Sequence, residues 1–308
     1  MSQGLVDDTA ADAALGIARP VEPGAGPGPA SRVDARRVLR FVVRRPGLLL
    51  SVLVLVLVVL ASFWPGLFTS RDPLTGVPSQ NFRGPSGAHW FGTDELGRDV
   101  LSRVVHGAQL SLKATLIAVA VAFVVGSLIG LVAGFVGRWI DDVLMRFVDV
   151  LLSIPALFLS LALVTALGYG TVKVAVAVGI ASVASFARVT RAEVLRVRQA
   201  VFVEASRSCG ARWYSVLGRH VLPNAAGPVI VLATLDFGSS ILAVSALSFL
   251  GYGAPPPAPE WGTLISDGRN YLANAWWLTA LPGLAIAATV LATNRIARAL
   301  DGEWSRQS

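Results

Sequence analysis

Six long apolar stretches constrain the fold of this chain more than any other feature of its sequence. Each is close to the ~20 helical residues needed to cross the ~30 Å hydrocarbon core of a bilayer. Because lipid offers no hydrogen bonds to backbone N–H and C=O groups, helices are the economical way to cross. The sequence therefore predicts an all-α, polytopic membrane protein with six transmembrane helices, at residues 47–68, 113–136, 147–168, 172–188, 225–250 and 276–294.

The distribution of charge predicts how these helices are oriented. Hydrophobic residues make up 54% of the chain and charged residues only 15%, whereas soluble domains carry roughly a quarter charged residues. If the N-terminus is cytoplasmic, 19 of the 26 Lys and Arg residues fall on the cytoplasmic side and 7 on the other. This asymmetry follows the positive-inside rule. We therefore expect both termini to be cytoplasmic, and we interpret the net charge of +7 as a sign of orientation rather than of a nucleic-acid partner.

The chain divides into four segments around these helices. Residues 1–46 are expected to form a cytoplasmic tail that is disordered at first and then amphipathic. Residues 47–110 hold the first transmembrane helix and an extracytoplasmic loop. Residues 111–301 form the core with the other five transmembrane helices, and residues 302–308 form a second cytoplasmic tail.

Local signals refine the expectations for three regions. Near the end of the long loop, Thr93 is a candidate N-cap for a short interfacial helix that would contain an Asp99–Arg103 pair. Pro155 predicts a kink inside the third transmembrane helix. Two overlapping GxxxG patterns in the second transmembrane helix permit close helix packing, and they consist of Gly126, Gly130 and Gly134.

Motifs for catalysis and nucleotide binding are missing from the sequence. The only lysines are Lys113 and Lys173, and neither follows a glycine, so no GxxxxGK[ST] phosphate-binding loop can be written. There is no GxSxG elbow, and the histidines are far apart with no HExxH or CxxC motif. We therefore expect no enzymatic active site, no metal site and no cofactor bound by this chain.

A polar, arginine-rich segment, 188–223, separates the fourth and fifth transmembrane helices. Helix connections are usually about 2–8 residues long, so this segment is much longer than a turn requires. It predicts one helix over 201–208, with Phe202 and Ala205 on one face and Glu204 on another, and a second helix over 211–221. The expected turn and end signals are Gly210 between the helices, Leu222-Pro223 as a stop, and Asn224 as the cap of the next transmembrane helix.

The spacing in this segment resembles the EAA loop of binding-protein-dependent ABC importer permeases. The resemblance rests on Glu204-Ala205-Ser206, on Gly210 and on Leu222-Pro223. It extends over about residues 82–301 and is strongest for the C-type subunit of the dipeptide, oligopeptide and nickel branch. The other matching features include the runs 89–99 and 247–251, Trp261-Gly262 and Pro282-Gly283.

The resemblance implies a permease subunit in the plasma membrane of a bacterium, which transports dipeptides, oligopeptides or a related small solute by alternating access. The implied partners are a homologous B-type permease, two ABC ATPase subunits that bind ATP, an extracytoplasmic substrate-binding protein and the lipid bilayer. The implied ATPase-coupling residues are Glu204, Ala205, Ser206, Gly210, Leu222 and Pro223.

Several alternatives stay open at the level of the sequence. Nickel and other solutes are alternative substrates, and a self-sufficient secondary transporter or channel is an alternative class, although the apolar stretches carry few charges at depth. Val244 stands where the family often has an acidic residue, so a role for that carboxylate has no support here. Asp236, expected near the start of the fifth transmembrane helix, is either a functional ionisable residue or a solvated one close to the cytoplasmic interface.

Overall fold

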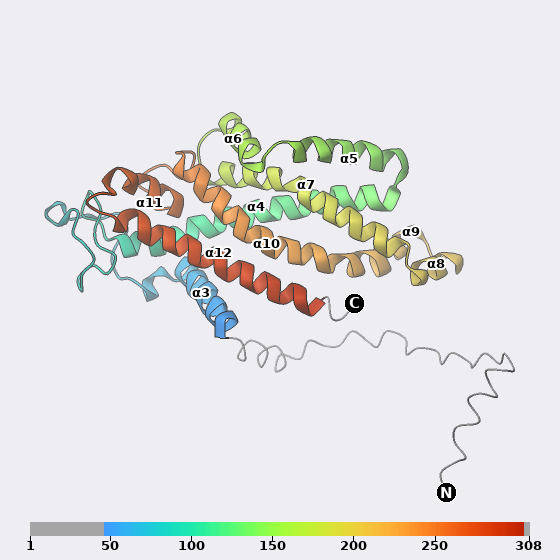
Figure 1. The fold of residues 1–308 in the computed structure, drawn as a ribbon, viewed down its shortest axis with the longest axis horizontal. Helices are drawn as coiled ribbons and strands as arrows, with labels where there is room; N and C mark the ends of the chain where they lie inside the picture. The colour runs from blue at the N-terminus through green and yellow to red at the C-terminus, as the bar shows by residue number, and fades with distance from the viewer. Residues whose placement is uncertain (1–45, 305–308) are drawn as a thin grey trace, which may run out of the picture. The chain divides into compact units, whose positions relative to one another are not determined.

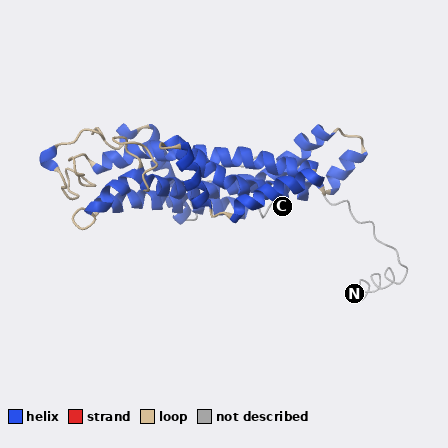
Figure 2. Ribbon diagram, turned by 90° about the horizontal axis from the view of Figure 1, so that it is seen from above, coloured by secondary structure: helices blue, strands red, loops and turns tan. Residues whose placement is uncertain are grey.

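The computed structural model describes residues 46–304, with side chains described through residue 299. The predictions for the N-terminal tail and for residues 305–308 lie outside the described residues. Within them the predicted all-α fold is confirmed: helices are joined by loops, and the only β-type pairing is an isolated bridge between Thr93 and Asp99 (Figure 2). In chain order the α- and π-helices are α3 (Pro46–Phe63), α4 (Val100–Val136), α5 (Arg138–Ser153), α6 (Ala156–Leu167), α7 (Thr171–Arg198), α8 (Val201–Ser208), α9 (Trp213–Val216), the π-helix η3 (Leu217–Val221), α10 (Leu222–Phe249), α11 (Trp261–Gly268) and α12 (Trp277–Trp304). Short 3₁₀ turns occupy η1 (Pro65–Leu67), η2 (Pro78–Gln80) and η4 (Arg269–Tyr271).

The membrane-spanning helices agree with five of the six predicted stretches and change the third. Five helices of the described chain are long and apolar enough to cross a bilayer, and their number rises to 6 if the bent pair α5 and α6 counts as one span. These two helices meet at an angle of 94°, so the predicted kink at Pro155 is in fact a break. Pro155 has no N–H and forces the preceding residue out of the helical region, and Ile154 is accordingly extended, at φ −96° and ψ 127°.

The glycines of α4 bring it into close contact with α7, as the sequence predicts. The two helices run side by side (Figure 1). A Cβ atom added to Gly126 would lie 2.6 Å from the carbonyl oxygen of Val183, and one added to Gly130 would lie 2.8 Å from the Cβ of Thr190. No larger residue fits at these positions without separating the backbones, which is the use that membrane proteins make of GxxxG patterns.

Ion pairs hold α5 along the half of α7 that leads to Arg198. Arg191 of α7 contacts Asp141 of α5 at 2.6 Å, and Arg188 contacts Asp149 at 2.6 Å. Val148, which lies between Asp141 and Asp149 in the sequence of α5, is buried. These contacts attach α5 to α7, although α5 leaves much of its apolar surface exposed.

The predicted helix stop at Leu222-Pro223 is wrong, because α9, η3 and α10 form one continuous helical rod. The N–H of Leu222 donates to the carbonyl of Leu217, five residues back, which widens this turn into a π-helix. The wider turn accommodates Pro223, which cannot donate the usual i→i−4 bond and would otherwise break the helix. Asn224 does not cap a new helix, and instead its side chain donates to the carbonyl of His220 at 2.6 Å.

The remaining long helices complete the bundle around α10. Helix α12 packs against α10 on one side and against α3 on another (Figure 1). Two buried tryptophans link the start of α4 and the loop before it to the starts of α11 and α12. The Nε1–H of Trp261 donates to the carbonyl of Val104 at 2.8 Å, and that of Trp277 donates to the carbonyl of Thr93 at 3.1 Å.

Candidate functional site

The connection between α7 and α10, residues 199–221, contains the helix that the sequence predicts at 201–208, and α8 has those bounds. Phe202, Glu204 and Ala205 are all exposed, and the residue that faces inward is Val203, which is fully buried. A single valine therefore anchors this short helix.

The end of α8 has a geometry that requires glycine at position 210. Gly210 adopts φ +82°, in the left-handed region. Its N–H donates to the carbonyl of Arg207 at 2.9 Å, and the N–H of Ala211 donates to that of Ser206 at 3.1 Å. This pair of bonds is the Schellman arrangement, which satisfies the last carbonyls of a helix. Gly210 thus provides the expected turn.

A small apolar cluster joins the α7–α10 connection to the long helices. Val203 packs with buried valines of α7, α9 and η3, and the members of the cluster are Val194, Val197, Val203, Val216, Val221 and Ala225. Both helices that flank the connection contribute to this cluster. Val203 therefore links α8 to the ends of α7 and α10 by direct packing.

The outer surface of the α7–α10 connection is unusually apolar for an exposed segment. Val201 is 82% exposed and Trp213 is 67% exposed, and Phe202 and Tyr214 are exposed beside them. Adjacent charges come from Glu204, Arg207 and Arg212. Large exposed apolar side chains on neighbouring helices are typical of an interaction site. Helices α8 and α9 lie beyond the end of α7, where such a surface is accessible (Figure 1).

The structure brings some of the predicted coupling residues together and separates the others. Glu204, Ala205, Ser206 and Gly210 lie on α8 and its terminal turn, where all are exposed except the half-buried Ser206. Leu222 and Pro223 are exposed at the start of α10, after the π-helix. They belong to the rod that leads away from the α7–α10 connection.

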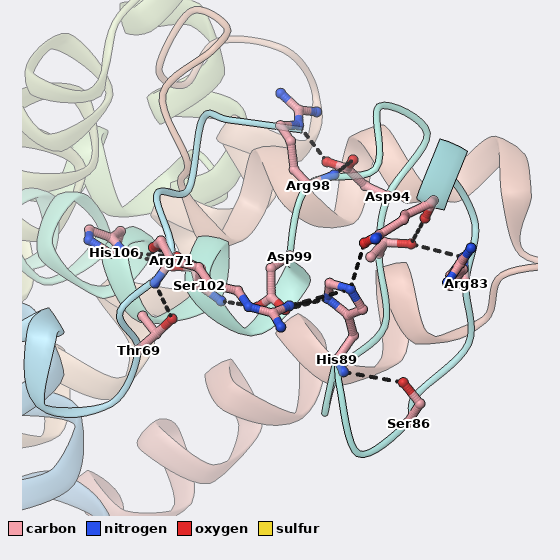
Figure 3. Close-up of polar contacts among 12 residues, drawn as sticks. Thr69, Arg71, Arg83, Ser86, His89, Asp94, Arg98, Asp99, Ser102 and His106 are labelled. Atoms are coloured by element: carbon pink, nitrogen blue, oxygen red, sulfur yellow. Dashed lines mark hydrogen bonds and ion pairs between the residues drawn. The ribbon is translucent and has the colours of Figure 1, made fainter. Parts of the chain in front are cut away.

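A second polar site lies in the loop between α3 and α4, residues 64–99, and Asp99 is its centre (Figure 3). Its Oδ1 accepts the backbone N–H of Ser102 at 2.9 Å, so Asp99, and not Thr93, is the N-cap of α4. Its Oδ2 lies 2.8 Å from the guanidinium of Arg71 and 2.8 Å from Nδ1 of His89. The predicted Asp99–Arg103 pair and the separate interfacial helix are therefore wrong. Asp99 is committed to this loop, and α4 runs unbroken from Val100.

Thr93 has a different role from the one predicted. Its hydroxyl accepts the backbone N–H of Arg83 at 2.9 Å and donates to the carbonyl of Gln80. These bonds join two distant parts of the α3–α4 loop, so Thr93 fixes the path of the loop instead of starting a helix.

The acidic and basic residues just before α4 form a buried network. Asp94 accepts from Nε of Arg98 at 2.6 Å and from Nη1 of Arg103 at 3.1 Å, and all three residues are buried. Asp267 of α11 lies 3.8 Å from Arg103. Burial raises the pKa of the Asp267 carboxyl, and the charge of Arg103 opposes that rise. This network was not predicted from the sequence, although the i,i+4 spacing of Asp94 and Arg98 is a signal for it.

Comparison with known proteins gives a family for this arrangement. Residues 126–306 match the family described as "Binding-protein-dependent transport system inner membrane component". The chain belongs to this family. It is a membrane-embedded permease subunit of an ABC importer and not an enzyme, and ATP hydrolysis takes place in separate subunits. The predicted resemblance is thereby confirmed.

Curated relatives cover most of the chain. It is 41% identical over 239 residues to the dipeptide transport system permease protein DppC of Alkalihalophilus pseudofirmus, an alignment that covers 78% of each chain. It is 40% identical over 244 residues to the probable D,D-dipeptide transport system permease protein DdpC of Escherichia coli, covering 79% of this chain and 82% of the relative. It is also 42% identical over 211 residues to the glutathione transport system permease protein GsiD of Pectobacterium atrosepticum, covering 68% and 70%.

Solved structures show the same fold at much lower identity. An inward-facing structure of the MetNI methionine ABC transporter matches with a TM-score of 0.52 and 20% identity, covering 64% of this chain and 96% of the other. An amino acid ABC transporter with histidines matches with a TM-score of 0.52 and 17% identity, covering 65% and 94%. At these identities the likeness concerns the fold alone.

Proposed function

We propose that this permease transports dipeptides, oligopeptides or a closely related small solute. The observation that carries the proposal is the identity of about 40% to relatives named for dipeptide, D,D-dipeptide and glutathione transport. Those names all describe short peptides. The chain would move its solute by alternating access, in which packed helices rock as rigid bodies between two states.

The α7–α10 connection is proposed as the docking site for an ATPase subunit. Glu204, Ala205 and Ser206 of α8 would contact the ATPase, with Gly210 holding the turn. Exposed aromatic residues, which are typical of protein interfaces, support this role. The buried Val203 supports it too, because it would pass a pull on α8 to the ends of α7 and α10. Leu222 and Pro223 would act at the start of the α10 rod.

The orientation and partners follow from that role. The α7–α10 connection would face the cytoplasm, as would both termini, and the α3–α4 loop would face the exterior. There the permease would receive solute from a substrate-binding protein. We further propose that a homologous B-type permease and two ATPase subunits complete the transporter, and that this chain binds no ATP of its own.

Uptake by the reconstituted transporter tests the proposal. The chain would be purified with its partner permease and ATPase subunits and placed in proteoliposomes with the substrate-binding protein. We expect uptake of a labelled dipeptide that requires ATP, and its loss when Glu204→Lys reverses the charge on α8. Glu193→Lys, which changes a charge on α7 before the connection, is the matched control. Uptake that continues with a hydrolysis-deficient ATPase would instead favour a secondary transporter.

A further inference from the structure

A polar strip lies midway along the two membrane-spanning helices α7 and α10. It consists of Ser182 and Ser185 of α7 and of Asp236 and Ser239 of α10. Ser185 and Ser239 are exposed, and the other two are half-buried. The prediction that Asp236 lies near the start of its helix is wrong, because α10 begins well before it and Asp236 meets Ser182 near the middle of α7.

Among the described residues, the Asp236 carboxylate accepts hydrogen bonds only from hydroxyl groups. The Ser182 hydroxyl donates to Oδ1 at 3.3 Å, and the Ser240 hydroxyl donates to Oδ2 at 3.1 Å. Within the described residues no Lys, Arg or His reaches its carboxylate within the 4.0 Å of an ion pair. Two carboxylates of α5 differ in this respect, since Asp141 and Asp149 each pair with an arginine of α7.

The packing of α10 explains why Asp236 faces the strip. Two residues along the helix, Gly238 is buried against α12, where an added Cβ would lie 2.8 Å from the side-chain oxygen of Asn294. Positions two apart on an α-helix point about 200° apart, because each residue turns it by about 100°. Asp236 therefore points away from α12 and toward α7, where Ser182 contacts it.

Lipid does not satisfy such a surface. Ionisable residues inside a membrane face the bundle interior or a water-filled cavity, and they pair with opposite charges there. A carboxylate has about four acceptor positions, and the two serines use one on each oxygen of Asp236. The Ser239 hydroxyl already donates to the backbone carbonyls of Leu235 and Asp236 at 3.3 Å. The unused acceptor capacity of the strip is therefore on the Asp236 carboxylate, which can accept a cation.

We propose that Asp236, with Ser182, Ser185 and Ser239, forms a subsite on the solute pathway that binds a positively charged group. This proposal rests on the proposed function for its identification of the ligand, which for a short peptide would be the α-ammonium group. Charge-assisted hydrogen bonds of this kind are short and strong, and they would orient the N-terminus of the peptide during its passage.

Thiol labelling tests the site without assuming any substrate. Ser239→Cys would be made in a Cys209→Ser background, since Cys209 is the only native cysteine. The assembled transporter would be treated with a cationic trimethylammonium or an anionic sulfonate methanethiosulfonate reagent. We expect the ratio of the cationic to the anionic rate to exceed the ratio for a free thiol in solution by about tenfold, which corresponds to about 1.4 kcal/mol of local attraction. Asp236→Asn should abolish the preference. Leu242→Cys, on an exposed apolar position of α10, is the control.

Three labelling results would contradict the subsite. If the Ser239→Cys variant reacts with neither reagent, or if its preference survives Asp236→Asn, the subsite is overturned. The same holds if the Leu242→Cys variant reacts as quickly as the Ser239→Cys variant, because the strip would then not be distinguished from its surroundings.

Uptake of a labelled dipeptide tests the ligand. Asp236→Asn should reduce maximal uptake about tenfold, and Asp236→Glu should retain most of it, while Asp149→Asn serves as a control on another carboxylate. Normal uptake by Asp236→Asn would exclude a role in solute binding. If the wild-type transporter moves no peptide, the proposed substrate fails, but the labelling experiment still decides whether the cation subsite exists.

Discussion

The backbone N–H of Ala211 donates a 3.1 Å hydrogen bond to the carbonyl of Ser206, across a turn in which Gly210 adopts φ +82°. This bond defines where α8 ends and in which direction the chain returns to α9. Because α8 is only eight residues long, its direction depends on its two ends and on Val203. The turn at Gly210 is therefore a mechanical part of the proposed coupling site.

Replacing Gly210 should impair coupling more than folding. A side chain at positive φ costs about 1–2 kcal/mol, so Gly210→Val should shift or fray the end of α8. We expect strong loss of ATP-driven uptake with normal amounts of protein in the membrane. Gly218→Ala is the matched control, because Gly218 also has open space around it but has no positive φ. If Gly210→Val transports normally, the turn is not needed for coupling.

Truncating Val203 should loosen the anchor of α8. Val203→Ala removes two buried carbon atoms, which at about 0.8 kcal/mol for each CH₂ costs about 1–2 kcal/mol locally. Hydrogen exchange of the α8 amides should become faster. The rate of ATP hydrolysis by the assembled transporter should fall. Val201→Ala, at a position 82% exposed, should change neither the exchange of α8 nor the stability of the chain. Equal exchange rates in the two variants would contradict the anchoring role.

The long helices and α8 could be predicted from the sequence because their signals are local. The apolar stretches specify helices by length alone, and Gly210 specifies a turn by its freedom at positive φ. The closely packed glycines of α4 were also predictable, since small residues repeated every four positions lie on one face.

The errors concern residues whose partners are distant in the sequence. Thr93 and Asp99 are both residue types that are favoured as N-caps. Which of them caps α4 depends on the hydrogen bonds that each makes within the α3–α4 loop. Arg71 and His89 reach Asp99, whereas Gln80 and Arg83 engage Thr93. The continuation of the helix through Pro223 depends on a π-turn that opens one residue earlier. Neither outcome follows from local preferences.

Removing Asp94 should destabilise the α3–α4 loop strongly. Asp94→Ala would leave Arg98 and Arg103 without their shared carboxylate, and an uncompensated buried charge costs about 3–5 kcal/mol. We expect a lower melting temperature of the purified chain in detergent. Glu95→Ala is the control, because the Glu95 side chain is 27% exposed in its pair with Arg98, and such rim pairs contribute about 1 kcal/mol or less. Similar melting temperatures for the two variants would show that the network does not stabilise the loop.

Asp267 and Asp72, two described aspartates outside the spans with perturbed pKa values, should give opposite pH effects. Burial raises the pKa of Asp267 above its ordinary value, so the folded state binds this proton more tightly than the unfolded state. Stability from this group is therefore greatest at acidic pH and decreases as the pH rises through the raised pKa. Asp267→Asn should melt at a higher temperature than the wild type near neutral pH, and the difference should shrink as the solution is made acidic.

Asp72 provides the comparison of opposite sign. The N–H of Leu74 donates to its carboxylate at 2.7 Å, and this bond lowers the pKa of Asp72 below its ordinary value. A lowered pKa contributes stability above the unfolded value that is lost as the pH falls. Asp72→Asn should accordingly melt slightly below the wild type near neutral pH and approach it in acid. Melting curves of both variants and the wild type in detergent, from neutral to acidic pH, measure how these differences in melting temperature change with pH. If the two differences from wild type change in the same direction with pH, the assignment of at least one carboxyl environment is wrong, since burial and hydrogen bonding to the charged form act on the proton in opposite senses.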